Sequence, residues 1–167
     1  MVASDSCYIS TLGQDSHRFK ASGESGRIIL GGASIPFELD MDANSDGDVI
    51  LHALTNAISG YTCRNILGQV ADKLCLDEGV TDSKVYLKLA LDDLSAMKAK
   101  IVHVSISVEC KRPKLSPFME DIRLSLSNLL GLSTSSIGIT ATTGEGLTSF
   151  GCGEGIQVFS IITIKTN

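Results

Sequence analysis

Residues 101–108 alternate between apolar and polar side chains. Four apolar residues fall on one face of an extended segment and three polar residues fall on the other: Val102, Val104, Ile106 and Val108 against His103, Ser105 and Ser107. Successive side chains of a strand point to opposite faces of its sheet, so this alternation predicts a strand that is buried on one side. The second face of such a sheet must meet water or a partner subunit, and we favour an oligomer.

The flanking segments predict helices and further strands. Ser45 and Asp48 resemble a capping box with Asp in place of Glu, and the apolar helix that follows is expected to end near Gly60. The other expected elements are helices at 85–97 and 117–130, strands at 7–12, 27–30, 137–141 and 157–164, a loose end at 1–6 and a long connection at 63–83. This order predicts an α/β fold, an α+β sandwich in which helices cover one face of a mixed β-sheet.

The composition excludes several classes of protein. The chain has 167 residues, of which 43% are hydrophobic, enough to bury the core of one domain over 1–167. Charged residues make up 20% and the formal net charge is -5, which argues against disorder and against a broad basic face for nucleic acid. No apolar stretch is long enough to span a membrane, and the first 20 residues resemble no signal or transit peptide. We therefore expect a cytoplasmic protein without a nucleic-acid or membrane partner.

The cysteines point to the same compartment. There are five of them, with no CxxC pair: Cys7, Cys63, Cys75, Cys110 and Cys152. An odd number without paired spacing disfavours both a disulfide framework and a cysteine zinc site. Buried thiols in a reducing compartment are the expected arrangement.

Two of the three histidines stand near a carboxylate or a helix start. Asp15 and His17 are two residues apart at the end of an expected strand, so their side chains project to the same side. His52 lies one helical turn beyond Asp48. One carboxylate and two imidazoles suit a catalytic Zn²⁺ site with three protein ligands and one open position. The alternative is that Asp15 caps a turn and the histidines make ordinary hydrogen bonds, and the spacing alone does not exclude it.

Two further segments could bind phosphate. Glycines at 144–146 and 151–155 would let the backbone approach an anion, and Glu145 among them could hold a divalent cation. Lys111, Arg112 and Lys114 follow the 101–108 strand and could neutralise a phosphate group. A glycine-rich hairpin loop and a solvated basic turn are the alternatives.

The ordered series of these segments resembles the 2-C-methyl-D-erythritol 2,4-cyclodiphosphate synthase family from Gly13 to about Thr163. The matching motifs are Gly13-Gln14-Asp15-Ser16-His17, Ile29-Leu30-Gly31-Gly32, Ser45-Asp46-Gly47-Asp48-Val49-Ile50-Leu51-His52-Ala53-Leu54, Pro113-Lys114-Leu115, Thr142-Thr143-Gly144-Glu145-Gly146-Leu147 and Gly153-Glu154-Gly155. The resemblance implies one cyclodiphosphate synthase-like domain in a homotrimer, with the sheets of three subunits packed together and active sites at the subunit interfaces.

The resemblance also implies a reaction. The 2-phosphate of 4-diphosphocytidyl-2-C-methyl-D-erythritol 2-phosphate attacks the β-phosphorus, CMP leaves, and the 2,4-cyclodiphosphate forms. Such an enzyme is a metal-dependent phosphorus-oxygen lyase of non-mevalonate isoprenoid biosynthesis. The alternative is a non-catalytic trimeric protein on the same scaffold that binds a nucleotide or an isoprenoid phosphate. A third possibility is a monomeric structural domain without zinc.

Matched residue by residue, the motifs imply roles for the candidate site. Asp15, His17 and His52 would hold one Zn²⁺ per subunit, and Glu145 would hold Mg²⁺ or Mn²⁺ on the substrate diphosphate, which Thr143 would position. The expected substrate contacts are Asn44, Ser45 and Asp72, and the expected cytidine pocket is formed by Cys110, Pro113, Lys114, Leu115, Ala141 and Thr142.

The chain departs from the family pattern at several positions. Asn44 stands where the family usually has His. In a sugar-binding stretch, Ile66 replaces the first aspartate and Asp72, displaced by one residue, stands in for the second. Ser149 and Cys152 replace a Phe and an Arg that line the central cavity of the trimer. Because that Arg would clamp an anion, we expect an isoprenoid diphosphate site there to be weak or absent.

Overall fold

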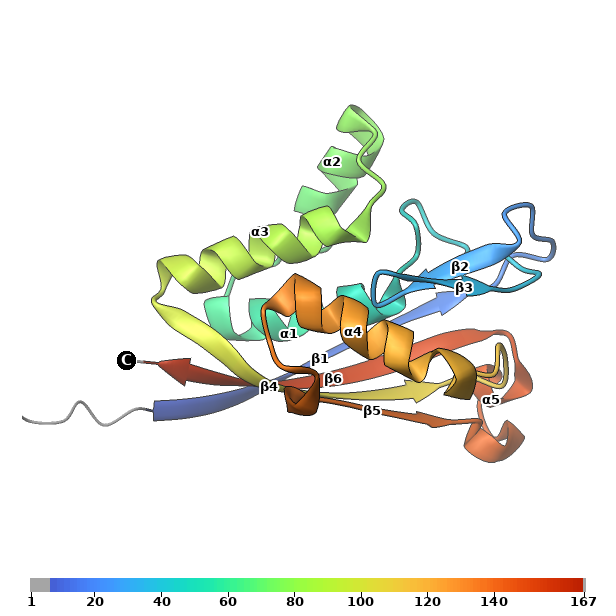
Figure 1. Ribbon diagram of the computed structural model, residues 1–167. Coiled ribbons are helices and arrows are strands. Elements are labelled where there is room, and N and C mark those ends of the chain that lie inside the picture. The colour runs from blue at the N-terminus through green and yellow to red at the C-terminus, as the bar shows by residue number, and fades with distance from the viewer. Residues whose placement is uncertain (1–6, 167) are drawn as a thin grey trace, which may run out of the picture.

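Four strands form one mixed sheet at the centre of the molecule (Figure 1). The computed structural model describes residues 7–166, so the expected loose end at 1–6 lies outside the described residues. The strand order is β1-β6-β4-β5, with bounds β1 Cys7–Arg18, β6 Gly155–Thr166, β4 Ala99–Glu109 and β5 Ile137–Thr142. β4 and β5 run parallel, whereas β1–β6 and β4–β6 are antiparallel. The expected mixed sheet is confirmed.

Three helices cover one face of this sheet (Figure 1). They are α1 Val49–Thr62, α3 Ser83–Ala96 and α4 Met119–Leu130. Helix α1 packs on β1 and β6, and almost all of its residues from Val49 to Ser59 are buried. Because water reaches so little of this helix, its sequence is apolar on most sides. The expected arrangement of helices on one face is confirmed.

The start of α1 differs in detail from the expected capping box. Asp48, not Ser45, is the N-cap, and its side chain accepts a hydrogen bond from the Leu51 N–H. The helix passes the expected end at Gly60 and stops at Thr62, where Cys63 takes the left-handed conformation and caps it.

The expected long connection at 63–83 is wrong, because α2 Gln69–Glu78 lies inside it. Only Ala71 of this helix is buried, and the helix projects away from the sheet (Figure 1). Its buried side is limited to Ala71, Leu74 and Cys75, and the exposed apolar residues Val70 and Leu76 reduce the contrast between its two sides. This is why its sequence resembles a loop. The expected strand at 27–30 is β2 Arg27–Leu30, but it pairs in a separate hairpin with β3 Ala33–Pro36, which the sequence analysis missed.

Several boundaries also shift. β1 continues to Arg18, so Asp15 and His17 lie within the strand and not at its end. An irregularity in β4 at residues 101–103 leaves Val102 half-buried, and Ile101 takes its place on the buried face. The glycine-rich segment after β5 contains a short helix, α5 Ser149–Cys152, and single 3₁₀ turns stand at η1 Ser116–Phe118, η2 Thr134–Ser136 and η3 Gly144–Gly146.

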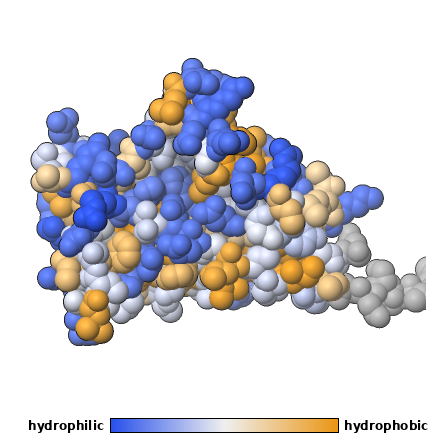
Figure 2. Space-filling view, turned by 180° about the vertical axis from the view of Figure 1, so that it is seen from behind, coloured by the Kyte–Doolittle hydropathy of each residue, from blue (hydrophilic) through white to orange (hydrophobic). Residues whose placement is uncertain are grey.

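The other face of the sheet carries large apolar side chains that remain exposed. Leu12 is 58% exposed, Phe159 42% and Ile161 47%. Ile161 stands between Leu12 on β1 and Ser105 on β4, so these residues share one face. In the view from behind, orange patches lie along the lower margin, with pale residues of intermediate hydropathy between them (Figure 2). Across residues 7–166, α1, α3 and α4 all lie on the opposite side of the sheet.

Two further expectations concern the cysteines and the membrane. All five cysteines are free thiols, but only Cys110 is buried, so the expectation that the thiols are buried is wrong for most of them. None of the helices in the described part of the chain has the length and apolar character that a bilayer crossing requires.

Candidate metal centre and substrate pocket

A close approach between β1 and α1 brings the three candidate metal ligands together. Gly13, Asp15 and His17 alternate onto the face of β1 that lies under α1, and His52 is in the first turn of that helix. A Cβ atom on Gly13 would lie 2.0 Å from the Ala53 carbonyl oxygen, so only glycine allows this spacing. The glycine of the first motif therefore sets how near His52 comes to Asp15 and His17.

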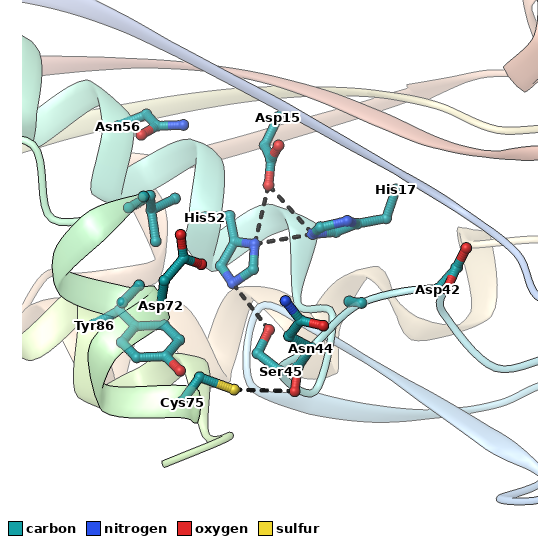
Figure 3. Close-up of a pocket in the computed structure, with 14 residues that line it drawn as sticks. Asp15, His17, Asp42, Asn44, Ser45, His52, Asn56, Asp72, Cys75 and Tyr86 are labelled. Atoms are coloured by element: carbon teal, nitrogen blue, oxygen red, sulfur yellow. Dashed lines mark hydrogen bonds and ion pairs between the residues drawn. The ribbon is translucent and has the colours of Figure 1, made fainter. Parts of the chain in front are cut away.

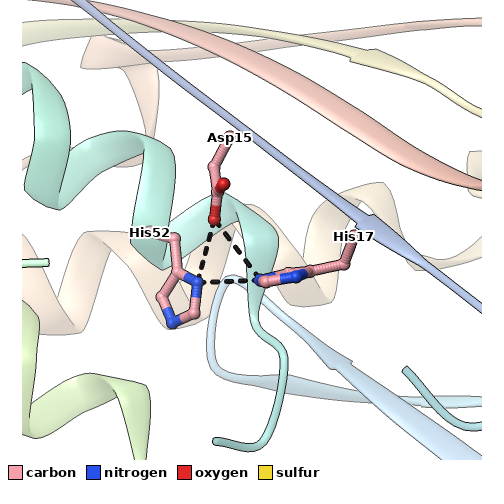
Figure 4. A group of neighbouring side chains, drawn as sticks. All are labelled: Asp15, His17 and His52. Carbon is pink, nitrogen blue, oxygen red and sulfur yellow. Dashed lines mark hydrogen bonds and ion pairs between the residues drawn. The ribbon is translucent and has the colours of Figure 1, made fainter. Parts of the chain in front are cut away.

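The three side chains converge on one point (Figures 3 and 4). His52 Nδ1 lies 3.0 Å from Asp15 Oδ2 and 3.0 Å from His17 Nε2, and His17 Nε2 lies 3.3 Å from Asp15 Oδ2. Ligand atoms that sit roughly 2.0–2.1 Å from a tetrahedral zinc ion are about 3.3 Å apart, close to these separations. The donor set and its spacing therefore fit a divalent metal ion, and the expected convergence of the three residues is confirmed.

Burial favours the form of His17 that a metal needs. Removal from water lowers the pKa of His17, and the neighbouring Asp15 carboxylate acts in the opposite direction. A metal binds the neutral imidazole, so desolvation keeps this ring ready to coordinate.

A cavity of about 440 Å³ opens beside the three ligands. Asn44, Ser45 and Asp72, the expected substrate contacts, line it (Figure 3). Ile66, in contrast, is only 2% exposed, so it belongs to the core. Of the two positions, only Asp72 therefore faces the cavity.

The remaining candidate residues form a second group at the same end of the sheet, where β4 and β5 end, with β6 between them and the β1 residues Asp15 and His17. The Cys110 N–H donates to the Thr142 carbonyl oxygen at 3.0 Å, which joins the segment after β4 to the end of β5. Cys110, Pro113 and Leu115 are buried, whereas Lys114, Ala141 and Thr142 are exposed. Within residues 7–166, none of these side chains lines the cavity beside Asp15.

Glu145 and Thr143 belong to this second group. Glu145 is exposed in η3 with φ 51°, a left-handed conformation that non-glycine residues adopt at a cost of about 1 kcal/mol or more. Of the three cations nearby, Arg112 is engaged within the chain: it donates to Glu38 and to the Gly153 carbonyl oxygen. Lys111 and Lys114 remain exposed. The two groups of candidate residues, here called half-sites, thus share no cavity in the described part of the chain.

Comparison with known proteins shows to which family this chain belongs. The model of the YgbB family matches residues 9–165. A curated relative from Chlamydia felis, named 2-C-methyl-D-erythritol 2,4-cyclodiphosphate synthase, is 46% identical over 153 residues, which are 92% of this chain and 86% of the relative.

The chain belongs to the YgbB family.

Solved structures of YgbB relatives share the fold. The bifunctional IspDF from Campylobacter jejuni matches with a TM-score of 0.87 and 29% identity, over 98% of this chain and 43% of that one. The IspF from Plasmodium falciparum, solved as a CDP complex, matches with a TM-score of 0.81 and 26% identity, over 96% of this chain and 97% of that one.

Other residues of this YgbB chain lie at the cavity but were not predicted from the sequence. They include Asp42, Asn56, Cys75 and Tyr86 (Figure 3). The Cys75 thiol donates to the Asn44 carbonyl oxygen at 3.1 Å, and burial together with Cys75 raises the pKa of Tyr86 to about 12. Cys75 could not be placed because its helix, α2, resembles a loop in sequence. The Tyr86 position follows an ordinary helical pattern and carries no sign of a cavity.

Proposed function

We propose that this chain is an active 2-C-methyl-D-erythritol 2,4-cyclodiphosphate synthase. It converts 4-diphosphocytidyl-2-C-methyl-D-erythritol 2-phosphate to the 2,4-cyclodiphosphate and releases CMP, as a metal-dependent phosphorus-oxygen lyase of non-mevalonate isoprenoid biosynthesis. The observation that carries the proposal is the convergence of Asp15, His17 and His52 in a chain 46% identical to a curated synthase.

The reaction needs aligned oxygens and neutralised charge more than covalent help from the protein. Asp15, His17 and His52 would hold Zn²⁺, and Glu145 would hold Mg²⁺ or Mn²⁺. When bound, such cations supply Lewis-acid polarisation of the phosphate oxygens. The protein's own part is to orient the substrate between them.

Side chains around the cavity can provide that orientation. The Ser45 hydroxyl and the Asn44 amide line the cavity and would donate hydrogen bonds to phosphate oxygens, while Asp72 would accept from a sugar hydroxyl. Asn44 donates without charge, in contrast to the His usual at this position. Thr143 would donate to the diphosphate of a substrate that reaches the second half-site.

The second half-site would bind the nucleotide end of the substrate. Backbone groups of the joined segments after β4 and at the end of β5 would read the cytosine edge, and Lys114 would meet phosphate. The residues of this pocket are Cys110, Pro113, Lys114, Leu115, Ala141 and Thr142. The CDP complex of the Plasmodium falciparum relative supports a nucleotide ligand for this fold.

Two half-sites that do not meet in one chain imply that neighbouring chains complete each other. We propose a homotrimer of single-domain subunits in which the zinc half-site of one chain faces the nucleotide half-site of the next. The exposed apolar residues on the helix-free face of the sheet support this packing.

A cytoplasmic location is supported by five free thiols. With Ser149 and Cys152 in place of Phe and Arg, the central cavity of the trimer would bind isoprenoid diphosphates weakly or not at all.

The decisive test measures CMP release from the diphosphocytidyl substrate with Zn²⁺ and Mg²⁺, against an EDTA-treated control. We expect metal-dependent CMP together with the cyclic diphosphate, and we expect His52→Ala to lose both zinc and activity while it keeps the fold. A protein that binds zinc and CDP but releases no CMP would be the non-catalytic binder. A His52→Ala protein with full zinc content would place the metal elsewhere.

A further inference from the structure

His52 has a second ring nitrogen, and its hydrogen bonds point away from the metal centre. His52 Nε2 lies 2.9 Å from Ser83 Oγ and 3.4 Å from Ser45 Oγ. Ser83 is completely buried at the first position of α3, and His52 is 7% exposed. In a buried polar pair of this kind, one atom must donate the hydrogen bond and the other must accept it, because water cannot replace either partner.

Asp46 determines which of the two atoms, Ser83 Oγ or His52 Nε2, is the donor. The Ser83 hydroxyl donates to Asp46 Oδ1, and the Ser83 N–H donates to Asp46 Oδ2 at 3.3 Å. A carboxylate only accepts, so the single proton of the Ser83 hydroxyl is used in this bond. Ser83 Oγ can then act toward His52 only as an acceptor, and the proton of the imidazole must stand on Nε2.

The consequence appears on the opposite side of the ring. A neutral imidazole protonated on Nε2 has its free electron pair on Nδ1, and Nδ1 is the atom that faces Asp15 and His17 (Figure 4). We infer that Asp46 and Ser83 are positioning residues, which hold His52 in the tautomer and orientation that present Nδ1 to the metal.

The backbone around these residues keeps the hydrogen-bond chain in place. The Asp46 N–H donates to the Thr81 carbonyl oxygen at 2.8 Å, and Asp46 Oδ1 also accepts from the Asp48 N–H at 3.2 Å. Asp46 thus links the segment before α1 to the start of α3. Loss of such an outer partner of a metal-binding histidine weakens metal affinity by about 10–100-fold in other sites.

The inference rests on the proposed metal site, so its test measures metal binding and not turnover. Metal-free protein is titrated with Zn²⁺ in competition with a chromophoric chelator. We expect Ser83→Ala to raise the zinc dissociation constant about 10–100-fold. Ser83→Thr keeps a hydroxyl and should stay within about fivefold of the parent. Asp46→Asn should weaken zinc binding about tenfold, because its amide can donate to Ser83 Oγ. The Ser83 hydroxyl is then free to donate to His52 Nε2, which reverses the direction of both hydrogen bonds.

The chain offers a matched control on the helix that carries His52. Ser59 is buried in α1, and its hydroxyl has no hydrogen-bond partner in the described structure. Ser59→Ala therefore removes a buried hydroxyl without touching the His52 contacts, and its zinc affinity should equal that of the parent.

A spectroscopic measurement tests the tautomer directly. In zinc-loaded protein, ¹⁵N-edited NMR should detect a slowly exchanging His52 Nε2–H, which Ser83→Ala should lose. Zinc affinity within twofold of the parent in both Ser83→Ala and Asp46→Asn, or a proton on Nδ1, would overturn the inference. If Ser83→Ala does not fold, Asp46→Asn and the parent spectrum decide. A His52→Ala protein that keeps its zinc would contradict the proposed metal site itself. This variant therefore distinguishes a wrong metal site from a wrong positioning role of Ser83 and Asp46.

Discussion

The Asp48 carboxylate joins two backbone segments at one buried point. It accepts hydrogen bonds from the N–H groups of Gly31 at 2.8 Å, Gly32 at 2.6 Å and Leu51 at 3.0 Å. Asp48 thereby fastens the turn of the β2–β3 hairpin to the start of α1. The whole residue is inaccessible to water. The aspartate that the family motif places four residues before His52 therefore has a structural role here, distinct from metal binding.

Removal of this carboxylate should be costly. Asp48→Ala leaves three N–H groups without an acceptor, and we expect it to lower the free energy of unfolding by about 3 kcal/mol or more, measured by urea denaturation. Asp82→Ala is the matched control, because Asp82 caps α3 at the surface through one bond to the Lys84 N–H. That substitution should cost about 1 kcal/mol. Equal losses in the two variants would contradict the role assigned to Asp48.

Cys110 should be the least reactive of the thiols. Burial raises its pKa to about 11, while Lys114 acts weakly in the opposite direction. A raised pKa keeps the thiol protonated, so at pH 8 only about one molecule in a thousand carries the reactive thiolate. Iodoacetamide at pH 8 should label exposed Cys63 and spare Cys110 when the native protein is mapped by peptide mass spectrometry. Labelling of both cysteines at the same rate would show that the Cys110 thiol is accessible to solvent.

At the scale of the elements, the packing of α1 on β1 depends on one small residue. A Cβ atom at position 13 would meet the Ala53 carbonyl oxygen at 2.0 Å and the Ala57 nitrogen at 2.3 Å, and both are backbone atoms of a buried helix. Gly13→Ala must therefore push α1 off the strand. We expect a loss of about 3 kcal/mol or more of unfolding free energy, together with weaker zinc binding.

Gly60→Ala provides the comparison within the same helix. Its added Cβ would lie 3.7 Å from the nearest atom, an ordinary contact, so the substitution should be neutral or stabilise by about 0.5 kcal/mol. If Gly13→Ala unfolds at the same urea concentration as Gly60→Ala, the close approach of strand and helix does not limit the size of residue 13.

Elements with a local pattern were predictable, and elements held by tertiary contacts were not. The alternation around Ser105 and the apolar run of α1 have a periodicity that sequence alone reveals. Helix α2 buries only Ala71 and leaves Val70 and Leu76 exposed, so its apolar pattern is weak. The same distinction applies to the site. Asp15 and His17 are related by strand spacing, whereas Ser83 reaches His52 from 31 residues away, a contact that no spacing rule anticipates.

For the whole molecule, the helix-free face of the sheet and the separation of the two half-sites point to the same assembly. A charge at the centre of that face should separate the subunits, because a buried carboxylate without a partner is strongly unfavourable. Ile161 stands on the central strand β6, between β1 and β4, and is 47% exposed in the single chain. Ile161→Asp is therefore the sharpest perturbation of the proposed trimer.

We expect the parent to sediment at about three times the subunit mass of 17.6 kDa and Ile161→Asp at one. CMP release by the variant should fall below about 1% of the parent rate, since each zinc half-site loses its nucleotide half-site, which corresponds to about 3 kcal/mol. Zinc should stay bound, because Asp15, His17 and His52 come from one chain.

Leu124→Asp is the control. Leu124 is 56% exposed on α4, across the sheet from this face, and its substitution should leave the sedimenting mass and the activity unchanged. An Ile161→Asp protein that remains trimeric and active would mean that another surface joins the subunits, whereas a monomer with full activity would mean that one chain completes the site alone.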